Sequence, residues 1–211
     1  MKTFALLTAL TLSFSGLTQA QSHHSAGRAP AGGGGNLTQS VINELNRVRT
    51  NPQAYAAYLA EHRGLYTAEG YLKQPGRPLL RTHEGVAALD EAIRELSHAR
   101  AQAPLNASDL LVGSGRLLID EQSRNGQTGH GSFPFERMAR AGVVGGSRGE
   151  DVAYGAHTAE QIVYNLVVDD GVRDRGHRRN IMQTMFSEAG VSVGAHPVYG
   201  TMCVIDFSGR Y

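Results

Sequence analysis

Three short segments of the sequence carry side chains that could bind a metal ion or transfer a proton. The first surrounds His130, which has a glycine on each side, the second contains Glu150 and Asp151, and the third, residues 169–181, holds His177. Imidazole and carboxylate groups are ligands for zinc and similar ions. Histidine also titrates near neutral pH, so the same groups could act as acid and base.

The local spacing of these residues matches no known zinc signature. The sequence has neither His-Glu-x-x-His nor a pair of cysteines, so spacing alone favours histidines that are hydrogen-bonded at the ends of loops. Nucleophilic catalysis is also disfavoured, because no Gly-x-Ser-x-Gly elbow is present. Ser132 is better placed to cap the helix that follows it.

The length of 211 residues points to one domain with flanking segments. Residues 1–20 have the form of a secretory signal peptide, with Lys2, an apolar run from Phe4 to Leu12 and a small residue at the end. The run is too short to span a membrane. We therefore expect a secreted, extracellular protein with no transmembrane segment after signal removal. A flexible glycine-rich linker over 21–36 and a folded domain over 37–211 complete the predicted organisation.

Charge and cysteine content exclude some partners and constrain the fold. Loss of the signal removes Lys2 and lowers the 20 basic side chains to 19, equal to the 19 acidic ones. Such a balance disfavours nucleic acid as a partner. Cys203 is the only cysteine, so the domain has no internal disulfide. Its apolar, strand-like surroundings predict a buried and unreactive thiol.

Hydrophobic periodicity predicts an α+β domain with helices packed on a small antiparallel sheet. Glycines 113 and 115 interrupt the pattern of one helix, and residues 64–84 have an irregular pattern. Helices are expected from about residue 36 or 38 to 51, after Pro52, over 85–101, after Asp109, from Pro134 to Ala141 and from Thr158 to 169 or 170; strands are expected over 152–154, 189–194 and 199–207, with a turn at His196-Pro197.

Three ordered motifs resemble the CAP superfamily of cysteine-rich secretory, antigen five and pathogenesis-related proteins. They are Gly129-His130-Gly131-Ser132, Gly149-Glu150-Asp151-Val152-Ala153 and Arg175-Gly176-His177-Arg178-Arg179-Asn180-Ile181. The chain is similar to the bacterial, disulfide-free branch with an SCP-like extracellular domain, and the resemblance covers about residues 37–208. It implies an α-β-α sandwich with a small central antiparallel sheet, flanked by helices, and a central cleft.

The resemblance also implies that two histidines and two acids line one cleft. His130 and His177 match the histidines, and Glu150 matches the first acid. The second acid is left among three candidates: Asp169, Asp170 and Glu188, of which Glu188 is favoured as a solvated charge at a strand end. The set implied by the resemblance would hold a divalent cation, zinc or magnesium.

Two features near these motifs have more than one interpretation. Asp151 stands where the family motif usually has asparagine, so it could strengthen cation binding or face solvent. The arginines near His177 are expected to pair with neighbouring aspartates, and the alternative is an anionic ligand at the mouth of the cleft. The arginines are residues 173, 175, 178 and 179, and the aspartates are residues 169, 170 and 174.

The resemblance leaves several functions open, because one fold can serve many. The leading hypothesis is a secreted binding or interaction protein whose ligand is a small molecule, a lipid or an extracellular protein. A metal-assisted extracellular hydrolase of peptide or cell-wall material is a second hypothesis, with Glu150 or an aspartate as base. Lipid or sterol binding and a purely structural module are further alternatives. These alternatives leave open whether the protein is an enzyme.

Overall fold

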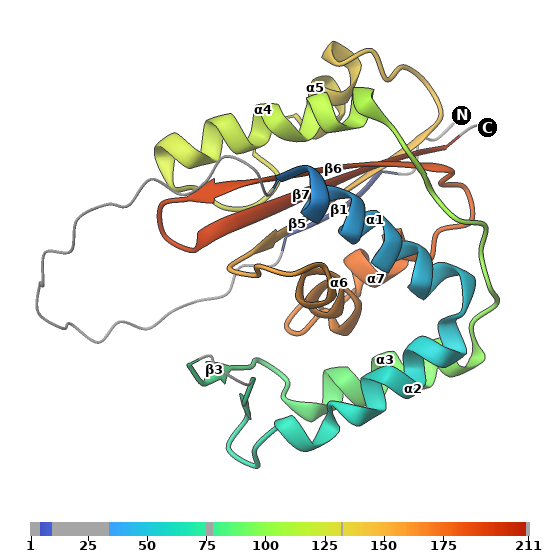
Figure 1. Ribbon diagram of the computed structural model, residues 1–211, viewed down its shortest axis with the longest axis vertical. Helices are drawn as coiled ribbons and strands as arrows, with labels where there is room; N and C mark the ends of the chain where they lie inside the picture. Colours follow the sequence, from blue (N-terminus) through green and yellow to red (C-terminus); the bar gives the residue numbers. More distant parts are fainter. Residues whose placement is uncertain (1–4, 10–33, 75–77, 132, 210–211) are drawn as a thin grey trace, which may run out of the picture.

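The computed structural model describes residues 5–9, 34–74, 78–131 and 133–209, and within them it confirms the α+β class. Helices α4 and α5 lie on one face of a central sheet, and α1, α6 and α7 lie on the other (Figure 1). The pair α2 and α3 packs beyond this second helical layer (Figure 1). The arrangement is the expected α-β-α sandwich with one additional helical pair.

The helices begin and end where local sequence signals favour it. The side chain of Asn51 accepts a hydrogen bond from the backbone of Ala54, with Pro52 in the first turn. Thr158 caps α6 in the same way through the backbone N–H of Gln161. The helices are α1 (Gly34–Thr50), α2 (Pro52–Glu61), α3 (Val86–His98), α4 (Asp109–Asn125), α5 (Pro134–Arg140), α6 (Ala159–Val168) and α7 (Gly176–Ile181), and a 3-10 turn η1 spans Arg63–Leu65.

The main sheet has the strand order β1-β5-β7-β6-β4. Its centre is antiparallel, with β7 between β5 and β6, whereas β1 and β4 add to the outer edges in parallel. A separate antiparallel pair, β2 with β3, lies beside α2 and α3. The strands are β1 (Ala5–Ala9), β2 (Tyr71–Leu72), β3 (Leu80–Arg81), β4 (Asn106–Ala107), β5 (Ser147–Tyr154), β6 (Glu188–His196) and β7 (Gly200–Gly209).

Close packing of α4 on the sheet explains two of the glycines. A Cβ added at Gly115 would lie 2.9 Å from the hydroxyl of Ser192, and one at Gly190 would lie 2.3 Å from the backbone nitrogen of Val112. Both distances are too short for a side chain, so glycine lets α4 approach the strands. The expected interruption at residues 113 and 115 is therefore wrong, since α4 runs unbroken through both.

Other boundaries differ from the prediction for physical reasons. β5 begins at Ser147 rather than 152, because the acidic residues Glu150 and Asp151 are buried and find polar partners. α1 begins at Gly34, inside the expected linker. Residues 64–84 contain η1 and the β2–β3 pair. The strand Ala5–Ala9 falls inside the segment 1–20, whose assignment as a secretory signal stays a prediction. Across the described parts of the chain, no helix is long and apolar enough to cross a membrane.

Candidate functional site

His130 forms a buried cluster with Glu150 and Arg137. Its Nδ1 lies 2.8 Å from one carboxylate oxygen of Glu150, and the guanidinium of Arg137 lies 2.5 Å from the other. Because an ionised carboxylate can only accept hydrogen bonds, Nδ1 of the imidazole carries the proton. The Nε2 atom of His130 is buried and has no hydrogen-bond partner among the described residues. Glu150 thus fixes the orientation of a ring whose second nitrogen is available.

Polar contacts from α4 and β5 hold the loop that carries His130. Gln122 donates a hydrogen bond to the carbonyl of Gly129 at 2.7 Å, and the Tyr154 hydroxyl accepts one from the amide of Gly129 at 2.9 Å. Tyr154 in turn donates to Gln122. Arg137 completes the support by donating to the carbonyl of His130 at 2.8 Å. The histidine is therefore positioned from three elements.

Asp206 adds a second carboxyl group to this cluster. It lies directly opposite Glu150 in the β5–β7 ladder, and it is fully buried. Burial, followed by the charge of Glu150, raises the pKa of Asp206 well above its ordinary value, and Ser114 and Arg137 oppose this effect only in part. Asp206 therefore holds its proton more strongly than an exposed aspartate does. The negative charge of Glu150 then has Arg137 as its counter-ion.

His177 forms a second pair, with Asp169. Its Nδ1 lies 2.5 Å from one carboxylate oxygen of Asp169, and its backbone N–H donates to the other at 3.0 Å. Both side chains are fully buried. Asp169 has left-handed backbone angles and ends α6, while His177 lies in the first turn of α7. One aspartate thus joins the end of one helix to the start of the next.

Two arginines connect this second pair to α3. Arg178 donates to the carbonyl of Val167, which satisfies one of the free carbonyls at the end of α6, and it pairs with Glu91 and Glu95. Arg175 donates to the carbonyl of Asp169. Arg175 also pairs with Glu84, two residues before α3, and with Glu91 in α3. Arg179 pairs with Asp174.

The expected pairing of these arginines with nearby aspartates therefore holds only for Arg179. Arg175 and Arg178 reach the distant acids of the α3 region instead, which the spacing along the chain does not reveal. Hydrogen bonds from Arg175 are the main reason that the pKa of Glu84 falls to about 2. The network thus fixes α3 to the segment that carries His177.

The two pairs lie on opposite faces of β5. Successive side chains of a strand point to opposite faces, and Glu150 contacts His130 whereas Asp151 contacts Asn180 of α7 at 2.7 Å. Asp151 is fully buried, so the alternative that it faces solvent is wrong. Burial raises its pKa to about 8, against the opposing effect of His177. Asp151 is therefore mostly neutral at pH 7 and adds little charge.

Backbone strain concentrates beside these pairs. Among the described residues, the only non-glycine positions with positive φ are Phe133, Asp169 and Arg175. Phe133 follows His130 by three positions, and Arg175 precedes His177 by two. Left-handed angles cost free energy in a residue with a side chain, and such strain gathers at functional sites. The strained residues thus lie in the same two segments as the two histidine–carboxylate pairs.

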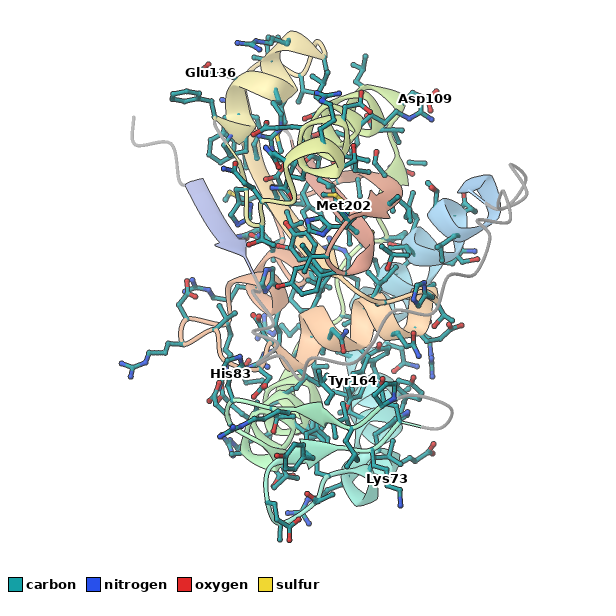
Figure 2. The ribbon with its side chains drawn as sticks, turned by 90° about the vertical axis from the view of Figure 1, so that its left-hand side faces the viewer. Lys73, His83, Asp109, Glu136, Tyr164 and Met202 are labelled. Carbon is teal, nitrogen blue, oxygen red and sulfur yellow. The ribbon has the colours of Figure 1, made fainter. Side chains whose placement is uncertain are left out.

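The remaining predicted site residues lie elsewhere. Asp170 accepts hydrogen bonds from the backbone of His83 and Glu84, at the boundary between the α3 region and the sandwich (Figure 2). Glu188 accepts one from Ser208 at 3.2 Å. Ser132 lies outside the described residues. Of the three candidates for the second acid, Asp169 is the one beside His177.

The fit of a divalent cation can be judged from the donor atoms. Within the described parts of the chain, no group of three or more His, Cys, Asp or Glu side chains is arranged to hold a metal ion. The carboxylates of Glu150 and Asp169 instead receive the Nδ1–H groups of the two histidines. In metal sites this is the position of an orienting partner rather than of a ligand. The described geometry therefore does not form the expected four-ligand set.

Sequence reasoning missed three residues that shape the site. Arg137 balances Glu150, Asp206 lies across from it, and Asn180 bonds to Asp151. One signal for Asp206 was present, because a lone acid in an apolar strand must find a partner or stay protonated. Arg137 carried no such signal, since an arginine in a short helix is usually solvated.

Comparisons with known proteins support the fold. No family model and no curated protein matches the chain. Among solved structures, it is similar to a cysteine-rich secretory protein from Staphylococcus aureus subsp. aureus Mu50, with a TM-score of 0.52 and 10% identity over 90% of this chain. The match spans 43% of that protein, which is less than half of its length. An outer surface protein from Borrelia burgdorferi matches 52% of this chain and 80% of its own, with a TM-score of 0.45 and 16% identity. The first similarity agrees with a CAP-type fold.

Proposed function

We propose that this chain is a secreted CAP-type binding domain whose ligand site borders the strand β5, between the two histidine–carboxylate pairs. One observation carries the proposal: His130–Glu150 and His177–Asp169 flank the same strand from its two faces. The Nε2 atom of His130, which has no hydrogen-bond partner in the part of the chain that the structure describes, supports it. A buried polar atom without a partner costs free energy that a ligand atom would recover.

Binding is favoured over hydrolysis by the chemistry of the charged groups. Glu150 is held by His130 and Arg137, so its lone pairs serve to orient the imidazole rather than to activate water. Burial and the charge of Glu150 raise the pKa of Asp206, which favours its protonated form and disfavours a role as general base. A hydrolase would still depend on the orientation that Glu150 provides. Loss of turnover in a folded Glu150→Gln variant would be needed to support that alternative.

Binding of a divalent cation is a second candidate, and the same Nε2 atom favours it. A histidine whose Nδ1–H is held by a carboxylate is oriented as a metal ligand would be. Zinc takes about four ligands, so His130 alone would bind it weakly. Lipid or sterol binding finds less support, because a cavity of about 360 Å³ near His130 is lined largely by charged side chains, including Arg137 and Glu136.

The experiment compares three probes on wild-type protein, His130→Ala and a control. Zinc chloride, phosphatidylcholine–cholesterol vesicles and an immobilised library of extended peptides are the probes. His98→Ala is the control, because His98 is an exposed histidine at the end of α3. We expect peptide binding that His130→Ala weakens at least about tenfold and His98→Ala leaves unchanged. Equal binding of peptide to both variants would contradict the proposal.

The other probes separate the alternatives. Heat of zinc binding that disappears in His130→Ala and persists in His98→Ala would favour the cation candidate. Vesicle binding that both variants retain would favour a lipid protein. N-terminal sequencing of protein recovered from the medium tests secretion, and we expect it to begin at Gln21.

A further inference from the structure

The outer edge of β5 is completed by β1, a segment that is distant along the chain. β5 is antiparallel to β7 along Ser147–Tyr154, and its other edge pairs in parallel with Ala5–Ala9. The ladder runs from Ala5 opposite Arg148 to Ala9 opposite Val152. Figure 2 shows β1 as the pale violet arrow at the outer side of the sheet. A five-residue strand therefore covers the outer edge of β5, the strand whose two faces carry the histidine pairs.

This edge needs a partner strand. An uncovered edge presents a row of unpaired backbone N–H and C=O groups and is a template for another strand. The segment that covers it here lies within residues 1–20, which have the form of a secretory signal. If that segment is removed on secretion, the outer edge of β5 loses its hydrogen-bonding partner over Arg148–Val152.

We propose that the outer edge of β5 is a peptide-binding site that takes an extended, uncharged segment as an added parallel strand, and that Ala5–Ala9 occupies it in the unprocessed chain. This inference rests on the proposed function and names the class of ligand for that site. Addition of a strand to a sheet edge is a general mode of peptide recognition, in which backbone hydrogen bonds supply affinity.

The charges along the edge indicate what the peptide must carry. Glu150 is balanced by Arg137 on one face. On the other face, Asp151 is fully buried and accepts a hydrogen bond from Asn180 at 2.7 Å. Arg148, opposite Ala5 at the end of the ladder, donates to the carbonyl of Phe135 and lies over its ring. Charged peptide side chains beside Glu150 and Asp151 would gain no partner and would lose hydration. The covering segment Ala-Leu-Leu-Thr-Ala has no charge and no proline, as this chemistry requires.

The same strand links the edge to the second histidine pair. α7, which carries His177, lies against β1 as well as against β5. In this state His177 is fully buried. A peptide on the edge would thus contact α7 on one side, and the His130 cluster would border the opposite face of the strand that binds it. Both pairs are placed to respond to the bound segment.

The first experiment uses the full chain and hydrogen exchange measured by mass spectrometry. Leu7→Pro removes a backbone N–H in the middle of the paired segment, whereas Leu12→Pro, outside the paired residues, is the matched control. We expect those amides of Arg148–Val152 that point towards β1 to exchange at least about tenfold faster in Leu7→Pro and at the wild-type rate in Leu12→Pro. The amides that bond to β7 should keep their protection in both variants. Identical exchange in wild type and Leu7→Pro would overturn the pairing.

The second experiment offers the edge a free peptide. A fluorescent peptide of residues 3–11 is titrated into a chain that begins at Gln21, after circular dichroism and melting show that this shortened chain is folded. We expect saturable binding, renewed protection of the same amides of Arg148–Val152, and at least about tenfold weaker binding of the peptide with Leu7→Pro. If the shortened chain does not fold, the same peptide is titrated into the full-length Leu7→Pro variant.

The outcomes separate this inference from the proposed function. No binding by a folded acceptor overturns the inference, and so does a dimer that protects β5 without any peptide. Equal binding of peptide to wild-type and His130→Ala acceptors would leave the edge site standing and would refute the role proposed for the histidine pair. Binding that both changes weaken, Leu7→Pro in the peptide and His130→Ala in the acceptor, supports both.

Discussion

The two histidine–carboxylate pairs are built from the same kinds of residues but have different surroundings. His130 retains 12% of its side-chain exposure, and its Nε2 atom has no hydrogen-bond partner in the described chain. His177 has no exposure, and Asp169 binds both its ring and its backbone. The arginine network then fixes the second pair to α3. The second pair is thus built into the fold, and in the proposed function it is the first pair that contacts the ligand.

The largest expected effect is the loss of the aspartate in the second pair. Asp169→Ala should lower the free energy of unfolding by about 3–5 kcal/mol, because it removes the acceptor of a buried imidazole and of two backbone N–H groups. Urea denaturation measures the change. Asp174→Ala is the control, since its ion pair with Arg179 is exposed and should contribute less than about 1 kcal/mol. Equal losses in the two variants would contradict the structural role of the second pair.

A smaller change in the free energy of unfolding, of opposite sign, is expected for the substitution Asp151→Asn, at a residue that lies between the two pairs. Its folded-state pKa of about 8 lies above the ordinary value of 3.8, so the native state binds the proton more tightly than the unfolded chain does. The contribution of Asp151 to the free energy of unfolding of the wild-type protein therefore falls as pH rises from about 4 to about 8. Asp151→Asn removes that loss and retains the carbonyl that Asn180 binds.

The variant should match wild type near pH 4 and exceed it by about 2 kcal/mol or more near pH 8. Thermal or urea unfolding across this pH range measures the difference. Asp174→Asn, at an exposed site, should show no such growth with pH. A difference between Asp151→Asn and wild type that stays constant with pH would show that Asp151 is ionised in the folded protein.

The smallest effect on stability is expected at His130. His130→Ala should cost about 1 kcal/mol, because Arg137 still balances Glu150 after the imidazole is lost. His177→Ala, which leaves Asp169 without its ring partner in a fully buried position, should cost several times more. Chemical denaturation of the two variants side by side gives the ratio. The comparison between the pairs breaks down if His130→Ala is the more destabilising change.

The sequence was sufficient for the fold class, but it did not give the pairing of the candidate site residues, whose role stays a prediction. The three motifs identified His130, Glu150 and His177, and the Thr158 cap of α6 was correct because capping is local. The partner of each histidine depends on which face of β5 a carboxylate occupies. That could not be read from the motif, because the charged start of β5 has the composition of a loop.

Contacts between distant segments were beyond the reach of local patterns. The partners of Arg175 lie 84 and 91 positions away, and the Arg137–Glu150 pair joins a helix to a strand. The cysteine was easier to interpret, because an apolar strand-like context is a local property. Cys203 is buried as predicted, and burial raises the pKa of its thiol.

The buried thiol of Cys203 provides a natural probe for opening of the core. Cys203 lies in β7, the middle strand between β5 and β6, and the chain has no other cysteine. A thiol-specific reagent can reach it only when the sheet separates from its helices. The rate of labelling under native conditions therefore measures how often the core opens, without denaturant. Opening of the β5 edge alone would leave that rate unchanged, so ligand entry and loss of the core can be timed separately.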